Sequence, residues 1–515
     1  MNIISVVLAL IPILAIFLLL VLRRTAADVA GSIGWVVAVL VAWLYFGTPI
    51  PVVLQASLGG VAASLPIALV VATSILQVTI MLETGAIARV VTVIKTVARE
   101  DQVVQILLIN IGFGTLLTAL GAVPVSILPP IMLALGYTSF VAIALPAIGY
   151  DALCTYALLG IPVVVFAKFV NQPVEVVGIY FAKYMPVVST CIAFGMLWIV
   201  GKWKMMWKGF IPTILAGVTA GAVAIGMNEL RVIPLTGIAA GLGVIAVMLV
   251  YLKIRGKKVI DRGGLTETDL MAEKRMPLTK AISPWLILVA FSLLVNAPFF
   301  PFFKLTFTQL AMPIPIIPGE PEKIRLFWQA YFWILISTLL ALPFLKPNKE
   351  QVKSSIKKWL KRAPRPTFAA AIFFAIAYVI NHSGKNIDWQ LVDQTKNMVA
   401  VIAHASAQAF GSLYSLVVPY LGLLGGFISG SETSSIAMLT KLHLSTAQQI
   451  GLSGIVLAAA SGIGGGLASV ISPAKLQNAA ASIDRIGEES QVIRTVFVIS
   501  LVITGVVALL TLIWA

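Results

Sequence analysis

Ionisable side chains stand inside long apolar runs at several points of this sequence. Asp151 lies in the apolar run 141–169, Glu432 lies in the sequence GSETSS, and Lys475 follows the sequence ISP by two residues. A charged group in apolar surroundings is costly unless it is paired or has a function. A buried carboxyl can exchange a proton near neutral pH. We therefore predict that Glu432 or Asp151 carries a proton, and that Lys475 pairs with Glu432 or binds the carboxylate of a ligand.

Histidines give a weaker signal of the same kind. His382 ends an apolar run at the sequence NHSG, and His404 lies within another run. Histidine titrates near neutral pH, so each could belong to a proton relay, or each could be a packed, hydrogen-bonded residue. His443 is expected in a loop.

Four stretches rich in Gly and Pro interrupt the apolar runs: Gly121–Pro130, Pro146–Pro162, Gly425–Ser435 and Ser461–Pro473. Gly and Pro weaken or break helices. At membrane depth, an irregular backbone is tolerated only where it is buried in protein or lines a cavity. The four stretches form two pairs at similar spacing, which predicts an inverted repeat with discontinuous helices. Two unrelated kinked regions are the alternative.

Hydroxyl side chains lie beside these breaks. A helix N-terminus in a break presents unpaired N–H groups and a partial positive charge, which suit a carboxylate. Hydroxyl groups there can add donors, or they can bond to backbone carbonyls and let helices pack closely. The predicted ligand contacts of this kind are Ser126, Ser431, Thr433, Ser434 and Ser472.

The composition indicates which elements carry these residues. Of 515 residues, 59% are hydrophobic and only 11% are charged, whereas a soluble chain has about a quarter charged residues. The apolar runs are continuous and show no alternation, which favours helices over a barrel. We predict an all-α polytopic membrane protein with about 12–14 transmembrane segments and re-entrant hairpins.

The basic residues gather between the apolar runs. The net charge of +16 is explained by cytosolic basic loops and not by nucleic-acid binding. Placing every basic cluster inside puts the N- and C-termini outside. The polar stretch 253–280 then divides the chain into an N-terminal half, 1–252, a cytosolic linker, and a C-terminal half, 281–515.

Several function classes lack their motifs. The sequence has no Walker A, HExxH or nucleophile-elbow pattern. Cys154 and Cys191 have no metal-type spacing. No enzyme, metal site or cofactor is expected. A secondary transporter driven by an ion gradient remains, with a membrane-embedded enzyme or a passive channel as the rivals.

Longer motifs resemble the bacterial and archaeal lactate permease family over almost the whole chain. They are the stretch 83–114, the stretch 368–384, GSETSS at 430–435, ISP at 471–473 and IGEESQVIRTV at 486–496. Glu432 matches the acidic position of the family's GS-acid-T motif. Ser431, Thr433, Ser434, Ser472 and Pro473 also match, and Asn381 and His382 stand in the motif NHSG, which makes them further predicted substrate contacts.

The resemblance implies proton-linked uptake of L-lactate, glycolate and related 2-hydroxy monocarboxylates. It also implies a scaffold-and-transport-domain fold in the plasma membrane of a prokaryote, and a possible homodimer. A sodium-coupled carrier, or a carrier of another small organic anion, is the alternative.

Three motifs depart from the family's pattern. Leu116 stands where the family has a glutamate before its first break, Ala474 and Lys475 follow ISP in place of Gln and Ser, and NHSG replaces NYSG. One half has therefore lost an acid, and the other has gained a base. We predict that Lys475 helps to neutralise the substrate carboxylate.

Overall fold

The computed structural model describes the chain except residues 1–2, 22, 24, 122–123, 297–300, 470, 472–474, 477–478, 481, 484 and 486–487. At some helical positions, among them Ser126 and Asp151, only the backbone is described. Nine helical stretches of this part of the chain are long and apolar enough to cross a membrane, and six shorter apolar helices accompany them. The prediction of an all-α polytopic membrane protein is confirmed.

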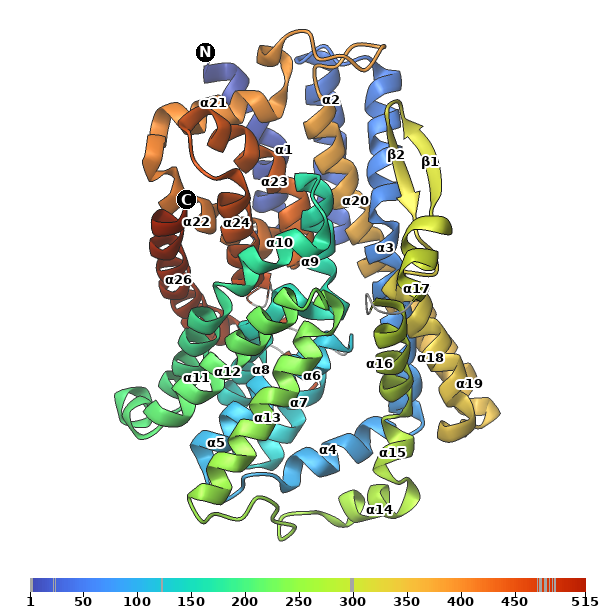
Figure 1. Cartoon of the computed structure of the whole chain (residues 1–515), viewed down its shortest axis with the longest axis vertical. Helices are drawn as coiled ribbons and strands as arrows, with labels where there is room; N and C mark the ends of the chain where they lie inside the picture. The colour runs from blue at the N-terminus through green and yellow to red at the C-terminus, as the bar shows by residue number, and fades with distance from the viewer. Residues whose placement is uncertain are drawn as a thin grey trace.

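The first half of the chain forms helices throughout (Figure 1). They are α1 (Ile3–Val21), α2 (Ala27–Leu44), α3 (Ile50–Glu83), α4 (Ala86–Thr96), α5 (Gln102–Leu107), the π-helix η1 (Leu108–Phe113), α6 (Gly114–Ala119), α7 (Pro124–Ala134), α8 (Ser139–Tyr150), the 3-10 helix η2 (Asp151–Tyr156), α9 (Ala157–Val170), α10 (Val174–Ala182), α11 (Met185–Lys208), α12 (Phe210–Glu229), η3 (Ile233–Leu235) and α13 (Thr236–Ile254).

The second half adds one hairpin of strands to its helices. The elements are α14 (Glu267–Arg275), α15 (Leu278–Ala281), α16 (Ser283–Asn296), α17 (Pro301–Lys304), η4 (Leu305–Gln309), β1 (Met312–Ile317), β2 (Glu320–Ile324), α18 (Ala330–Leu345), α19 (Lys349–Arg362), α20 (Pro364–His382), η5 (Gln394–Lys396), α21 (Met398–Phe410), η6 (Gly411–Leu413), α22 (Tyr414–Ser429), α23 (Glu432–Ile450), α24 (Gly454–Ser469) and α26 (Glu489–Trp514).

The two halves run in opposite directions around the middle of the molecule. α4 lies across the lower end of Figure 1, and α5 to α6 lead upward from it, whereas α21 lies at the upper end and α22 leads downward. Each of these helical paths then breaks, before α7 in one half and before α23 in the other. This arrangement agrees with the predicted inverted repeat with discontinuous helices.

The basic segments gather at one end. Figure 1 shows α4 and α14 at the lower end, α19 in the lower half, and both chain termini in the upper half. α19 carries the basic sequence KEQVKSSIKKWLKR. The basic segments and the chain termini thus lie toward opposite ends of the molecule, as the charge pattern predicts. The assignment of the basic end to the cytosol stays a prediction.

The linker 253–280 packs against α4. Lys95 of α4 donates to both carboxylate oxygens of Asp269, at 2.9 and 3.0 Å, and Arg89 pairs with Glu273 at 3.1 Å. Burial of the Asp269 carboxyl opposes its ionisation, but the hydrogen bonds from Lys95 and Thr266 outweigh that effect and hold its pKa below the usual value. The division of the chain at this linker stays a prediction.

Asp269→Asn is expected to loosen the linker, because the neutral amide loses the charge that Lys95 binds. A carboxyl with a lowered pKa stabilises the fold above its ordinary value of about 4, and the stabilisation is lost as the pH falls through the folded-state pKa. Tryptic cleavage within 253–280 at neutral pH should therefore be severalfold faster in D269N than in the parent protein. Glu267→Gln, at an exposed position of the same helix, is the control, and equal rates for D269N and E267Q would contradict the role of the pair.

Two local expectations are corrected. The strands β1 and β2 pair antiparallel, although the sequence predicts helices alone; alternating Pro and Ile in MPIPII disfavour a helix there. His443 lies in no loop. It is fully buried in α23, where the Tyr414 hydroxyl and the Ser461 hydroxyl lie 2.9 and 2.8 Å from its two ring nitrogens, so it ties α22, α23 and α24 together.

Candidate functional site

The break in the second half lies at Gly430 and Ser431. Gly430 ends α22 with a left-handed backbone, φ 65°, which glycine adopts without steric cost. Ser431 caps the next helix, and its hydroxyl accepts a hydrogen bond from the backbone N–H of Ser434 at 3.3 Å. The sequence GSETSS therefore builds a helix N-terminus in the interior of the membrane protein.

Glu432 is the first residue of α23 and is only 2% exposed. Its Oε1 accepts a hydrogen bond from the Thr155 hydroxyl at 2.6 Å. Its Oε2 is buried and has no hydrogen-bond partner among the residues that the structure describes. The N-terminus of a helix favours a negative charge, but a carboxylate with one buried, unpaired oxygen is costly.

A glycine of α24 makes room for this side chain. A Cβ atom at Gly466 would lie 2.8 Å from Glu432 Oε2 and 3.6 Å from the Cβ of Cys154. The bare backbone of α24 thus forms one wall beside the carboxyl, and Cys154 lies next to it.

Thr155 and Cys154 come from the second of the two predicted breaks in the first half, 146–162. α8 ends at Tyr150 and the chain continues as the 3-10 helix η2, in which Leu153 leaves the helical conformation. The next helix begins with left-handed backbone at Leu158, Leu159 and Gly160. Such conformations are costly for leucine and persist where the surrounding structure holds them. The two breaks therefore meet, one supplying a carboxyl and the other a hydroxyl.

Lys475 lies at the same place. Its Nζ stands 4.3 Å from the centre of the Tyr150 ring, and its charge acts on Glu432. A lysine over an aromatic face gains a cation–π attraction that is stronger in a desolvated site. Whether Lys475 pairs with Glu432 or binds the carboxylate of a ligand stays a prediction.

The remaining predicted hydroxyls divide into two groups. Thr433 and Ser434 are buried in the first turn of α23 beside Glu432. Ser472 lies outside the described residues, and only the backbones of Ser126, in α7, and Asp151, the first residue of η2, are described.

Asn381 and His382 lie away from the Glu432 carboxyl. His382 is 8% exposed and its ring lies 5.7 and 5.3 Å from those of Tyr378 and Trp389. Asn397 donates to the Asn381 carbonyl at 3.1 Å. The charge of Lys441 in α23 acts on His382. Lys441 lies nine residues beyond Glu432, which is about 14 Å along a helix. The structure does not bring these two predicted contacts to Glu432.

Comparison with known proteins decides the family. The family model described as L-lactate permease matches residues 5–515. The chain belongs to the L-lactate permease family.

Individual relatives cover nearly the whole chain. The L-lactate permease of Salmonella typhi is 26% identical over 98% of this chain and 95% of its own length. The glycolate permease GlcA of Escherichia coli is 24% identical over 99% of this chain and 96% of its own length. Among solved structures, the Alcanivorax borkumensis YdaH transporter matches 89% of this chain and 87% of its own, with 14% identity and a TM-score of 0.45.

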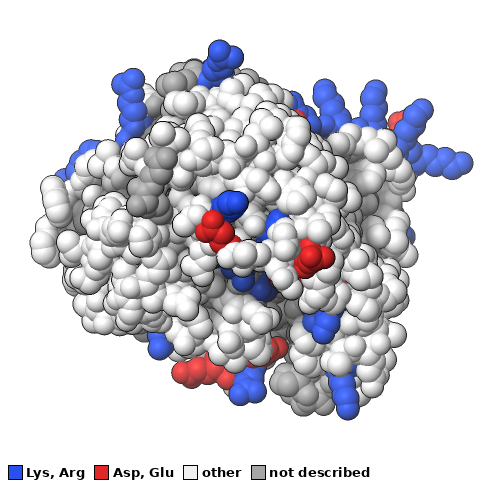
Figure 2. Space-filling model, turned by 90° about the horizontal axis from the view of Figure 1, so that it is seen from above, with Lys and Arg blue, Asp and Glu red and all other residues white. Residues whose placement is uncertain are grey.

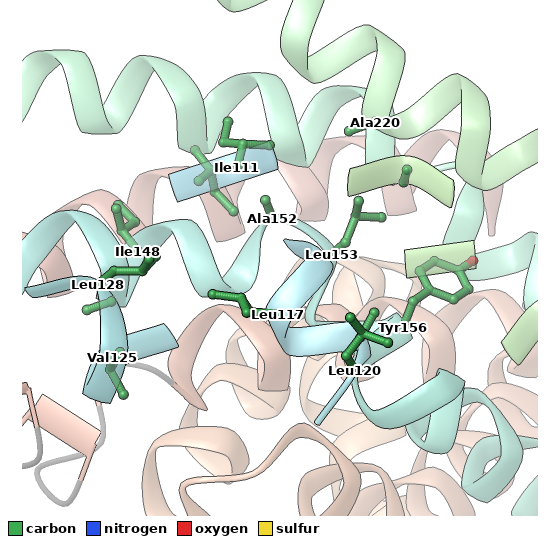
Figure 3. Packing of buried hydrophobic residues seen from close by; sticks show 14 of the residues in the cluster. Ile111, Leu117, Leu120, Val125, Leu128, Ile148, Ala152, Leu153, Tyr156 and Ala220 are labelled. Carbon is green, nitrogen blue, oxygen red and sulfur yellow. The ribbon is translucent and has the colours of Figure 1, made fainter. Parts of the chain in front are cut away.

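This member of the permease family has an apolar first break. Leu116 packs against Gly241 of α13. A Cβ atom added at Gly241 would lie 3.0 Å from the Cβ atom of Leu116. Figure 3 shows Leu117 and Leu120 close to Leu153 and Tyr156 of η2. The break 146–162 meets the break 425–435, and among the residues with described side chains Glu432 is the carboxyl at this meeting point.

Thr155 is the contact that sequence reasoning missed. It stands four residues after Asp151 in DALCTY, inside a stretch recognised as a break. Ser126 and Ser431 are predicted contacts because each is a hydroxyl residue beside a break in a helix. The same criterion would include Thr155.

Proposed function

We propose that this chain is a secondary transporter of a short 2-hydroxy monocarboxylate, L-lactate or glycolate, and that a proton gradient drives it. The observation that carries the proposal is the buried Glu432 carboxyl between the two broken helices of a chain that belongs, over its full length, to a permease family. The names of the lactate and glycolate permeases among its relatives support the substrate class.

Proton coupling follows from the cost of burying charge. A proton on Glu432 removes the cost of an unpaired carboxylate oxygen in an apolar site, while Thr155 holds the other oxygen. When the site opens to water, the carboxyl can lose its proton. Broken helices near the midplane are the arrangement that secondary transporters use for alternating access.

The substrate carboxylate needs a positive partner in the same site. Lys475 beside Tyr150 supplies a full charge, and the N-terminus of α23 adds a partial one. We place the end with α4, α14 and α19 in the cytosol of a prokaryote, because the basic segments gather there.

The test is uptake of labelled L-lactate into proteoliposomes, with and without an imposed inward proton gradient. Accumulation that needs the gradient and collapses with an uncoupler is expected. Uptake that follows a sodium gradient, or that never exceeds equilibration, would contradict proton coupling. No uptake of lactate or glycolate by folded protein would contradict the substrate.

Lys475→Gln is expected to raise the KM for lactate by roughly tenfold to a hundredfold, because a hydrogen bond to a charged group contributes about 1.5–3 kcal/mol. Initial rates of uptake over a range of lactate concentrations measure this. Lys204→Gln removes an equal charge from an exposed position on α11 and should leave the KM unchanged. A KM of K475Q equal to that of K204Q would remove Lys475 from the substrate site.

A further inference from the structure

The hairpin of β1 and β2 lies along the upper half of α3 (Figure 1). Ile317 of β1 is 2% exposed, and a Cβ atom at Gly59 of α3 would lie only 2.6 Å from its Cδ1. The Gln55 side chain of α3 donates to the Ile316 carbonyl. The hairpin is therefore seated on α3 by a buried anchor and a backbone contact.

Glu322 of β2 contacts two further elements, α20 and α9, through its carboxylate. Its Oε1 accepts a hydrogen bond from the Tyr378 hydroxyl of α20 at 2.7 Å, and its Oε2 accepts one from Lys168 of α9. The Glu322 side chain is 15% exposed, against 33% for Lys168. Charge-assisted bonds of this kind are stronger when partly desolvated.

Glu320 lies two residues before Glu322 and so points to the same side of the strand. Its oxygens lie 3.8 Å from Lys385 Nζ and 4.0 Å from His382 Nε2. Lys441 of α23 interacts electrostatically with both Glu320 and Lys385. The hairpin's two carboxylates therefore face three lysines that come from α9, from the loop after α20, and from α23.

The face seen from above in Figure 2 belongs to this end of the molecule, and acidic and basic side chains lie together near its middle, surrounded by uncharged atoms. Positive charges in a restricted region draw anions toward it. The Glu322 carboxylate beside Lys168 and the Glu320 carboxylate beside Lys385 both lie on the hairpin.

We propose that Lys168, Lys385 and Lys441 form an outer binding site for the carboxylate of the substrate, and that the β1–β2 hairpin is a gate whose Glu320 and Glu322 occupy this site in the present conformation. An incoming carboxylate replaces Glu322 at Lys168, and the hairpin then releases α9. The proposal rests on the proposed transport of a monocarboxylate and adds a second site to it.

α9 connects the two sites. Lys168 lies near its end, and Thr155, which holds Glu432, lies in η2 directly before it. The 14 residues of α9 span about 20 Å. When the substrate carboxylate replaces Glu322 at Lys168, the change occurs at the end of α9. The beginning of the same helix adjoins the buried site at Thr155 and Glu432.

The kinetic test uses opposite changes at one ion pair. Glu322→Gln removes the internal competitor and should lower the KM for lactate severalfold. Lys168→Gln removes the cation and should raise it severalfold, with kcat changed less than KM in both. Lys323→Gln, at the exposed position next to Glu322 on the same strand, is the matched control. A KM that moves in the same direction in E322Q and K168Q, or in neither, would overturn the site.

A second measurement does not need transport. Ile317→Cys places a thiol between the hairpin and α3. The rate at which a maleimide alkylates this thiol is measured with purified protein in detergent. The parent protein without I317C gives the background from Cys154 and Cys191. The rate should rise severalfold when E322Q is added to I317C. An unchanged rate would overturn the gate.

Lactate itself separates the two proposals. In I317C with Glu322 intact, saturating lactate should also raise the alkylation rate, and K168Q should remove this effect. If lactate is neither transported nor able to change the rate, while E322Q still raises it, the gate stands and the proposed substrate fails. If lactate is transported but does not change the rate, the outer site fails and the proposed function stands.

Discussion

Glu432→Gln is expected to abolish accumulation of lactate against its gradient while lactate–lactate exchange continues. The amide has almost the same shape as the carboxyl, and its oxygen can still accept the 2.6 Å hydrogen bond from Thr155. It cannot release a proton, so uptake loses its connection to the proton gradient. The internal lactate concentration at steady state should fall from several times the external one to equality with it.

Two measurements on the same proteoliposomes distinguish uncoupling from damage. Exchange of labelled against unlabelled lactate shows that the protein is folded and binds substrate, and proton-driven accumulation shows coupling. Glu267→Gln, which neutralises an exposed carboxyl in α14, should leave both unchanged. Accumulation by E432Q under a proton gradient would show that another group carries the proton, and Asp151 would then be the next residue to replace.

Gly426→Ala is expected to have the largest effect on stability. α22 and α24 approach so closely that a Cβ atom at Gly426 would lie 2.0 Å from the Gly465 carbonyl oxygen, and one at Gly422 would lie 1.8 Å from the Ser461 carbonyl oxygen. These obstacles are backbone atoms, which cannot turn aside. The helices must separate, and we expect a loss of about 3 kcal/mol or more.

Thermal unfolding of purified protein in detergent measures this loss. Gly226→Ala is the control, because a Cβ atom there meets no atom within 4 Å and alanine is favoured over glycine inside a helix. G226A should unfold at or above the temperature of the parent protein, and G426A well below it. Equal temperatures for G426A and G226A would mean that α22 and α24 pack less closely than described.

The same close approach has a consequence for the site. Gly466, the residue after Gly465 in α24, leaves the space in which the Glu432 carboxyl lies. Glycines in this helix thus serve two purposes, close packing against α22 and room for a buried acid. The sequence SGIGGGLAS was recognised as a break, whereas the structure shows a continuous helix as far as Ser469.

The sequence by itself determined that the chain is a helical membrane protein, that some of its helices are broken, and that Glu432 lies at one of these breaks. The reason is local: apolar runs need lipid, Gly and Pro disrupt helices, and a charge among apolar residues needs a special position.

Only the tertiary structure decided which groups meet. Thr155 and Glu432 are 277 residues apart, Lys168 and Glu322 are 154 apart, and the hairpin that carries Glu322 was not predicted. His382, a predicted substrate contact, lies near Lys441 and Glu320 and not beside Glu432. A hydrogen bond or ion pair between distant segments depends on how whole helices pack, and no local pattern of residue types records that packing.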